Sequence, residues 1–332
     1  MASVYSLKKD SAQSRLFSWQ ISTKVLAANP VTGVGTGYFG GAYAKQQAKY
    51  FVENPESKYL YVADCPTYAF NEYLQIGTEL GLVGLALFVM VIVLALLNVF
   101  IKPNPFQYGL VAILVFALTS YPFHLIPLLI FVVISIAAQQ STTLSGRLTG
   151  KIFFVILSIT AFTAWIGSHK PINNHINAQT EWHKLSSLYV MGIYDIEGYK
   201  EIHANLNYDY KFLFEYGHSL NKVGKHSESN EILRQGAALS NDPMFYNIMG
   251  DNFFVMNDYD RAEKSYEMAY NIVPSRIYPL YLLAKLYIEQ GDNVKALNMC
   301  RKIMDFRPKV HSPAVSEFKK EIEELMNKFP NE

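Results

Sequence analysis

The sequence predicts an all-α protein in which transmembrane helices follow a mixed helix-and-loop segment and precede a solenoid of helical repeats. Half of the 332 residues are hydrophobic, the formal net charge is only +1, and the charged residues are spread very unevenly. Two long runs hold no formally charged side chain, and small and aromatic residues recur near the C-terminus at a period of about 34 residues. The zones are a polar, aromatic-rich segment (1–79), a membrane region (80–168), a polar helical lead-in (169–206) and a repeat array (207–332).

Composition argues against a nucleic-acid partner. Phosphate binding needs a clustered basic surface, and this nearly neutral chain shows no basic cluster. Its two cysteines, Cys65 and Cys300, lie in different zones and do not suggest a disulfide framework.

The first zone predicts two helices. The stretch "DSAQSRLFSWQISTKVLAANP" begins with Asp10 or Ser11 as a helix cap and stops before Pro30. Arg15 and Trp19 are four residues apart in it, so they share one helix face. Residues 42–52 suit a second, short surface helix.

A glycine-rich stretch, "NPVTGVGTGYFGGAY", separates the two predicted helices. Its GxGxG resembles part of a dinucleotide fingerprint, but no strand and βαβ unit frame it. The glycines, among them Gly35 and Gly37, instead predict a loop that brings backbone amides close to another group.

The membrane region begins with Leu80–Ile101, 22 residues without a charged side chain. A helix of that length rises about 33 Å, enough to cross a bilayer core. Further transmembrane helices are predicted at 106–120, 122–140 and 151–168.

Pro122 and Pro127 leave two topologies open for the middle of this region, because proline either kinks a helix or separates two short ones. With two short helices, the positive-inside rule places Lys102 and Arg147 in the cytoplasm, and the repeat array shares the compartment of residues 1–79. A single kinked span would leave the array in the cytoplasm. We favour the first arrangement.

The repeat array carries the clearest pattern. Tyr246, Gly250, Ala262 and Pro274 have counterparts 34 residues later, namely Leu280, Ala284, Ala296 and Pro308. Their spacing resembles the tetratricopeptide repeat. Small residues let two antiparallel helices approach closely, so we interpret these positions as repeat core. The array also offers a concave surface to a protein partner.

Three segments ahead of and within the first span carry a second resemblance. In order and spacing, "KKDSAQSRLFSWQIS", "NPVTGVGTGYF" and "AFNEYLQIGTELGLVGLALF" resemble the large periplasmic loop and following span of the O-antigen ligase and polymerase superfamily. That superfamily includes lipopolysaccharide O-antigen ligases, O-unit polymerases and pilin oligosaccharyltransferases. The resemblance covers residues from about 7 to 140.

This resemblance implies a multi-pass protein of the bacterial inner membrane, with residues 1–79 in the periplasm. Its implied activity is metal-independent and cofactor-free glycan transfer from an undecaprenyl diphosphate carrier to an acceptor glycan or lipid A core. Arg15 matches the family's loop arginine, and a guanidinium suits the negative charge of a diphosphate leaving group. The alternative is a solvated arginine or one stacked on Trp19.

The other predicted catalytic residues are Asn71, Glu72 and Glu79, and the predicted substrate-binding residues are Trp19, Gly35, Gly37 and His124. Asn71 matches the motif's asparagine, although an asparagine before a helix is often a cap. Glu79 matches the acidic residue that opens the span, where a helix dipole also favours a carboxylate. His124 lies in the proline-flanked break and has the alternative of a hydrogen-bonded histidine between helices.

The chain departs from the family pattern in two ways. Phe70 stands where the family has a histidine proposed to activate the acceptor, and phenylalanine cannot accept a proton, which leaves Glu72 as a replacement base. The family also carries many spans ahead of this loop, so we expect weak or no transfer from this chain alone. A membrane-anchored repeat scaffold that recruits envelope assembly partners without catalysis is the alternative function.

Overall fold

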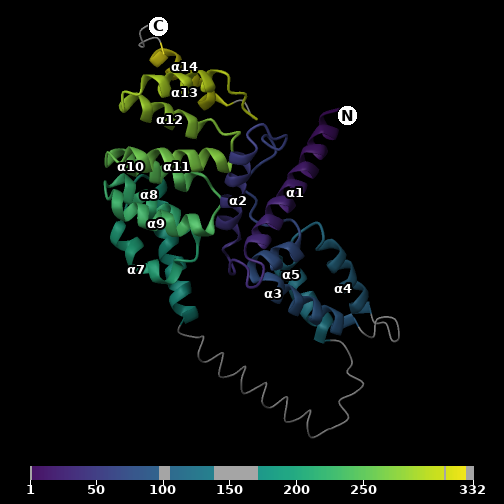
Figure 1. Ribbon diagram of the computed structural model, residues 1–332. Coiled ribbons are helices and arrows are strands. Elements are labelled where there is room, and N and C mark those ends of the chain that lie inside the picture. Colours follow the sequence, from purple (N-terminus) through teal and green to yellow (C-terminus); the bar gives the residue numbers. More distant parts are fainter. Residues whose placement is uncertain (1, 97–104, 138–170, 310–311, 327–332) are drawn as a thin grey trace, which may run out of the picture. The chain divides into compact units, whose positions relative to one another are not determined.

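The computed structural model describes residues 2–96, 105–137, 171–309 and 312–326, grouped in two compact units (Figure 1). One unit combines residues 1–85 with 208–332, and the other comprises residues 86–207. Throughout the described ranges the regular secondary structure is helical, which confirms the all-α prediction for them. The helix predicted at 151–168 lies outside the described residues.

Two helices build the N-terminal part of the first unit. Helix α1 (Ala2–Ala28) packs against α2 (Phe39–Glu53) around Phe17, which is almost fully buried. The prediction that the first helix begins at Asp10 or Ser11 is wrong, because no glycine or proline interrupts the chain before that point and the helix extends back to Ala2. The buried core consists of five aromatic residues, Phe17, Phe39, Tyr43, Tyr50 and Phe51, together with Ile21, Ala63 and Ala69.

Successive helical hairpins build the C-terminal part of the same unit (Figure 1). They pair α8 (Tyr210–Lys222) with α9 (His226–Leu239), α10 (Met244–Val255) with α11 (Tyr259–Ile272) and α12 (Tyr278–Glu289) with α13 (Asn293–Met304), before α14 (Pro313–Met326). Each hairpin turns on one left-handed residue: Gly224 (φ 79°), Asn257 (φ 57°) and Gly291 (φ 72°). The period seen in the sequence therefore corresponds to a repeated turn geometry.

Small residues allow the paired helices to approach closely. A Cβ on Gly250 would lie 2.3 Å from the ring of Tyr266, and one on Gly217 would lie 2.7 Å from the side chain of Leu233. Ala262 and Ala284 are completely buried. The interpretation of these positions as packing core is confirmed.

Helix α2 joins the N-terminal part of the unit to the hairpins, where it packs against α9 and α11. A Cβ on Gly41 would lie 2.1 Å from the carbonyl oxygen of Ala238, so only glycine permits this approach. Ala44 and Ala48 of α2 are buried against Ile272 and Val273.

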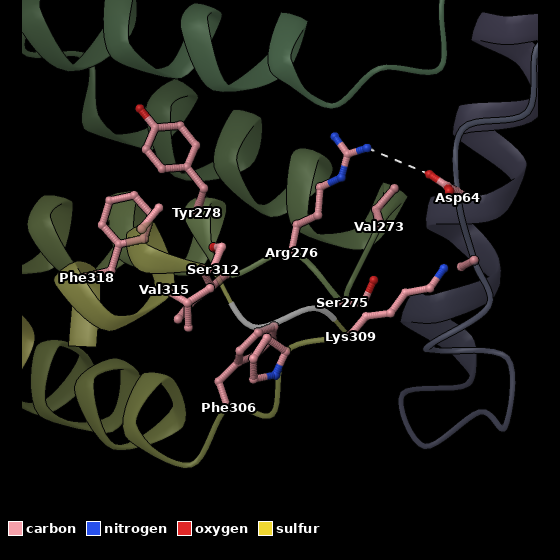
Figure 2. Close-up of a pocket in the computed structure, with 14 residues that line it drawn as sticks. Asp64, Val273, Ser275, Arg276, Tyr278, Phe306, Lys309, Ser312, Val315 and Phe318 are labelled. Carbon is pink, nitrogen blue, oxygen red and sulfur yellow. Dashed lines mark ion pairs between the residues drawn. The ribbon is translucent and has the colours of Figure 1, made fainter. Parts of the chain in front are cut away.

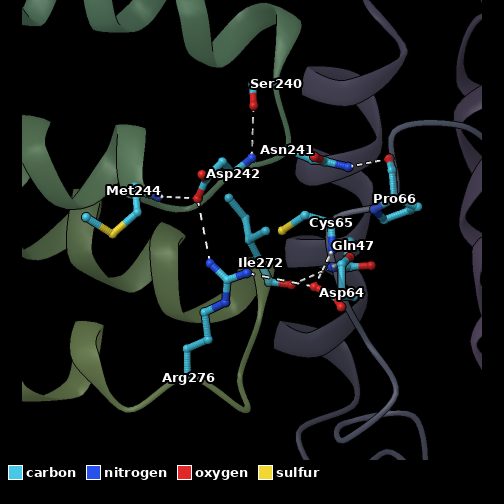
Figure 3. A network of polar contacts seen from close by, with 10 residues as sticks. All are labelled: Gln47, Asp64, Cys65, Pro66, Ser240, Asn241, Asp242, Met244, Ile272 and Arg276. Carbon is cyan, nitrogen blue, oxygen red and sulfur yellow. Dashed lines mark hydrogen bonds and ion pairs between the residues drawn. The ribbon is translucent and has the colours of Figure 1, made fainter. Parts of the chain in front are cut away.

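A network of hydrogen bonds also connects α2 and residues 64–66 to the hairpins (Figure 3). The fully buried Gln47 donates hydrogen bonds from Nε2 to the carbonyl oxygens of Asp64 (3.1 Å) and Ile272 (2.6 Å). Asn241 Nδ2 donates to the carbonyl oxygen of Pro66 at 2.7 Å. The side-chain amide of Gln47 thus links α2 to Ile272 at the end of α11, 225 positions later in the sequence.

The guanidinium of Arg276 adds ionic contacts at the edge of the junction. It lies 3.8 Å from the carboxylate of Asp64 and 3.6 Å from that of Asp242 (Figure 3). All three side chains are partly exposed, so solvent screens both contacts and each contributes little to stability.

Helix α3 (Glu72–Leu96) starts in the first unit and continues into the second, beginning eight residues before the predicted span. By length and composition it is the one helix among the described residues that could cross a membrane. The remaining described helices of the second unit are α4 (Pro105–Phe116), the short 3-10 helix η1 (Pro122–His124), α5 (Ile126–Ala137), a helical stretch at 171–190 and α7 (Ile196–Leu206).

Helices α4 and α5 pack on each other as separate short elements. A Cβ on Gly109 would lie 2.5 Å from the ring of Phe131, and Leu110 and Val132 are buried in their contact. Pro122 begins the 3-10 turn between them. The described residues therefore agree with two short apolar helices rather than one kinked helix.

Substitution of Gln47 tests whether the α2 junction stabilises the unit. Gln47→Leu removes both hydrogen bonds to the carbonyl oxygens of Asp64 and Ile272, and we expect the free energy of unfolding to fall by about 1–3 kcal/mol. Thermal unfolding of the full chain in detergent, followed by circular dichroism, measures the change. Gln46→Leu, at the half-buried adjacent position, is the matched control, and equal stability of the two variants would contradict the role given to Gln47.

Candidate functional site

The residues that match the family motif meet at the start of α3. The guanidinium carbon of Arg15 lies 5.5 Å from the centre of the Phe70 ring. One helical turn further along α1, Trp19 donates a hydrogen bond from Nε1 to the Phe70 carbonyl oxygen at 3.3 Å. Arg15 and Trp19, on one face of α1, therefore contact the ring and the backbone carbonyl of Phe70.

Phe70 has an unusual backbone conformation. Its φ of 53° lies in the left-handed region, which costs a bulky residue about 1–2 kcal/mol. Neighbouring contacts hold it there: the Ala69 amide donates to Gln75 Oε1 at 2.9 Å, and Trp19 binds the Phe70 carbonyl. The side chain at position 70 is therefore presented in a fixed direction beside Arg15.

Asn71 caps α3. Its Oδ1 accepts a hydrogen bond from the backbone amide of Leu74 at 3.0 Å, the ordinary contact of an N-terminal cap. Glu72 follows in the first turn of the helix and is only 2 % exposed. The start of a helix is a favourable place for a carboxylate, since the helix dipole is positive there.

A backbone break at Gly81, with φ 68° and ψ −172°, divides α3 where its apolar run begins. The glycine-rich loop, residues 30–38, hydrogen-bonds to the chain on both sides of this break. Val34 and Gly35 donate from their amides to the carbonyl oxygens of Thr78 and Glu79, both at 2.9 Å. The Leu82 amide donates to the Pro30 carbonyl oxygen at 2.8 Å, so the loop satisfies groups that a continuous helix would have paired internally.

Two glycines make this contact sterically possible. A Cβ on Gly33 would lie 2.4 Å from the carbonyl carbon of Glu79, and a Cβ on Gly81 would lie 2.1 Å from the carbonyl oxygen of Val31. Both residues also have φ of 68°. Gly37, by contrast, has φ 81° but open space around its Cβ position.

The Glu79 carboxylate links the loop to α3 through its side chain. Its Oε1 accepts hydrogen bonds from the Gly37 amide at 3.2 Å and from Gln75 Nε2 at 3.1 Å. Gln75 is nearly buried and bonds the Ala69 amide with its other side-chain atom. Glu79 and Gln75 thus connect the loop to the segment that carries Phe70.

The predicted site residues are unequally distributed between the units. Arg15, Trp19, Gly35, Gly37, Asn71, Glu72 and Glu79 all belong to the first unit and take part in the elements just described. His124 lies in the second unit, exposed at the end of η1. The sequence interpretation overlooked Gln75, although its position four residues before Glu79 on a helix is a signal for that contact.

A separate cavity of about 440 Å³ is lined by residues 63–64, by the segment at the start of α12 (273–278) and by the segment that leads into α14 (306–318), and by none of the predicted site residues (Figure 2). Arg276 and Lys309 supply positive charge to its lining, and Tyr278, Phe306 and Phe318 supply aromatic rings. Burial, with the Asp251 carboxylate, raises the pKa of Tyr278 to about 12, so its phenol stays protonated at neutral pH.

Among the described residues no group of histidine, cysteine, aspartate and glutamate side chains is arranged to hold a metal ion. The site at the start of α3 therefore contains the exposed Arg15 guanidinium and the Phe70 ring. The polar side chains of Gln75 and Glu79 lie just before the apolar part of α3.

Residues 1–89 match the sequence model of the family described as O-antigen ligase. The match spans α1, α2, the glycine-rich loop and α3 as far as Val89, and it includes every predicted site residue except His124. A comparison with curated proteins finds no match. Residues 1–89 are therefore similar to the O-antigen ligase family, and this match supports a membrane-associated function that involves glycan and lipid-linked substrates.

Paired glycine substitutions test the docking of the loop on α3. Gly33→Ala and Gly37→Ala carry similar strain from positive φ, about 1–2 kcal/mol each, but only Gly33→Ala also places a methyl group against the Glu79 backbone. We expect Gly33→Ala to expose residues 30–38 to limited proteolysis much faster than Gly37→Ala does. Equal cleavage rates for the two variants would show that the loop is not fastened as described.

Proposed function

We propose that residues 1–89 form a glycan-transfer site of the O-antigen ligase or polymerase type at the outer face of a bacterial inner membrane. The donor would be a glycan on undecaprenyl diphosphate, and the acceptor a second glycan or lipid A core. The observation that carries this proposal is the meeting of Arg15, Trp19 and Phe70 at the start of the helix that could cross the membrane. The family match over the same residues supports it.

Arg15 is the residue we assign to the diphosphate. Its side chain is exposed, its guanidinium rests on the Phe70 ring, and a cation–π contact at an exposed site is worth only about 0.5–1 kcal/mol. Charge-assisted hydrogen bonds to phosphate oxygens are stronger than this contact, and a guanidinium can make two of them at once. The hydrocarbon tail would remain in the bilayer beside α3.

Trp19, Asn71 and Glu79 are assigned to positioning. Trp19 holds the Phe70 carbonyl, Asn71 caps α3 and Glu79 fastens the glycine-rich loop. Gly35 contributes through its amide, which binds the Glu79 carbonyl oxygen.

Activation of the acceptor is the step for which this chain is least equipped. A general base must accept a proton, and Phe70 occupies the position where the family has histidine. Glu72 is the replacement we propose, and its burial means that the side chain must rotate outward to reach an acceptor hydroxyl. We therefore propose that carrier binding is strong and transfer by this chain alone is weak.

We propose that the hairpins are tetratricopeptide-type repeats and lie in the periplasm with residues 1–79. Support comes from the junction at Gln47, because two parts of one buried interface cannot lie on opposite sides of a bilayer. The chain between them must then cross the membrane an even number of times. The exposed surface of the array would be available to a protein partner.

Binding of the carrier lipid tests the role of Arg15. We expect Arg15→Ala to weaken binding of undecaprenyl diphosphate to the full chain in detergent by about tenfold or more, since a charge-assisted hydrogen bond contributes about 1.5–3 kcal/mol. Arg15→Lys keeps the charge but loses the forked geometry of the guanidinium, so its affinity should fall between those of the parent chain and Arg15→Ala. Lys45→Ala, an exposed cation on α2, is the matched control.

Unchanged affinity in Arg15→Ala, with the unfolding temperature also unchanged, would contradict the proposed role. It would also favour the scaffold function, which the tight α2 junction makes reasonable. If deletion of residues 207–332 abolishes surface glycan while Arg15→Ala does not, the scaffold function is the correct one.

Cysteine labelling tests the shared compartment. We expect Glu56→Cys in the N-terminal segment and Val294→Cys in the array to react equally with a membrane-impermeant maleimide in cells with a permeabilised outer membrane. Both positions are exposed, so burial does not bias the comparison. Labelling of only one of them before lysis would contradict the proposed topology.

A further inference from the structure

The stretch from Val25 to Ala44 has no charged side chain. It reads "VLAANPVTGVGTGYFGGAYA" and extends from the end of α1 through the glycine-rich loop into α2. The ends of this stretch are buried, but residues 27–32 and 36–38 are exposed and also carry no charge.

Hydrogen bonds place this loop against the apolar part of α3. The Leu82 amide donates to the Pro30 carbonyl oxygen at 2.8 Å, and the Val83 amide donates to the Val31 carbonyl oxygen at 3.4 Å. Leu82 and Val83 follow the Gly81 break, where the uncharged run of α3 is already under way. The tip of the loop therefore lies level with the first residues of the candidate span.

The apolar side chains at this level point away from the protein. Val31 is 61 % exposed and Tyr38 is 47 % exposed on the loop, while Leu82 and Val83 are 53 % and 54 % exposed on α3. They lie on two segments that backbone hydrogen bonds join, and α3 carries further exposed apolar residues such as Leu87. Exposed apolar side chains at the start of a candidate transmembrane helix indicate contact with lipid.

We propose that the glycine-rich loop lies in the boundary between lipid headgroups and acyl chains and contacts lipid through Val31 and Tyr38. Tyrosine is favoured at this depth because its ring is apolar and its hydroxyl remains hydrated. The backbone amides of Val34 and Gly35 are already paired with α3, which lowers the cost of placing this segment of irregular backbone near hydrocarbon. The loop thereby fixes how deeply the first unit sits in the membrane.

This inference requires that α3 enters the bilayer and does not depend on glycan transfer. Lipid contact by the loop would set the depth of the site relative to the bilayer. The Glu79 carboxylate, two residues before the break, would be held just outside the acyl chains. The polar cluster would face the depth at which a lipid-linked phosphate lies.

Depth-dependent fluorescence quenching tests the proposal on the full chain. Single cysteines are introduced by Val31→Cys, Leu82→Cys and Glu56→Cys, labelled with an environment-sensitive dye, and reconstituted in vesicles of phosphatidylethanolamine and phosphatidylglycerol. Native thiols contribute little background: Cys300 is fully buried, and burial raises the pKa of Cys65 to about 12, which leaves little thiolate at neutral pH. The parent chain, treated with the same dye, measures the background fluorescence from Cys65 and Cys300.

We expect the dye at position 31 to lose fluorescence when lipids brominated near the headgroup end of the acyl chains are included, and to lose less with lipids brominated near the chain ends. The dye at position 82 should also lose fluorescence with the brominated lipids. The dye at position 56 should lose fluorescence only when iodide, a water-soluble quencher, is added. A position-31 dye that behaves like the Glu56 dye would overturn the proposal. Strongest quenching from the chain ends would also overturn it, as would a Leu82 dye that no brominated lipid quenches.

Discussion

The break in α3 at Gly81 is the constraint on which the arrangement of the site depends. A helix that continued through this position would pair its own amides and carbonyls, and residues 30–38 would lose their backbone partners on α3. Because φ at Gly81 is 68°, the carbonyl oxygens of Thr78 and Glu79 and the amide of Leu82 turn toward the loop and are satisfied by it. The loop connects α1 to α2, so this contact also orients the helix that carries Arg15.

A second constraint is the burial of α2 against the helical hairpins. Gln47 and Gly41 show that the interface is buried and closely packed rather than a loose surface contact. The hairpins therefore support the N-terminal segment as part of one folded body. A motif segment held from two sides, by α3 and by the hairpins, can keep Phe70 in a strained conformation that an isolated loop would not maintain.

The sequence predicts those parts of the structure that depend on local spacing. The hairpins were expected from small residues such as Gly250 and Ala284 because helix pairs need them at fixed positions along one chain segment. A helix over residues 42–52 and the apolar run in α3 follow from the same kind of local pattern. The prediction that this helix lies at the surface is wrong, because α2 is packed against α1, α9 and α11. The meeting of the segments around Arg15 and Phe70 was expected only through resemblance to a family, since fifty-five residues separate them.

Contacts between distant segments and unusual backbone angles were beyond this kind of prediction. Gln47 is an ordinary glutamine in a surface-type helix until Ile272 is placed beside it. Gly81 reads as one of several glycines in "LGLVG", and the side chain of Phe70 gives no sign of a positive φ. In each case the deciding energy comes from a partner far away in the sequence.

Hydrogen exchange at the Val34 and Gly35 amides is the sharpest test of the docking of the loop on α3, because these amides donate to the carbonyl oxygens of Thr78 and Glu79. With the full chain in vesicles, we expect both amides to exchange much more slowly than in an unstructured peptide and to be protected together with the Leu82 amide. Exchange of Val34 and Gly35 at the unstructured rate, while the amides of α1 stay protected, would contradict this docking.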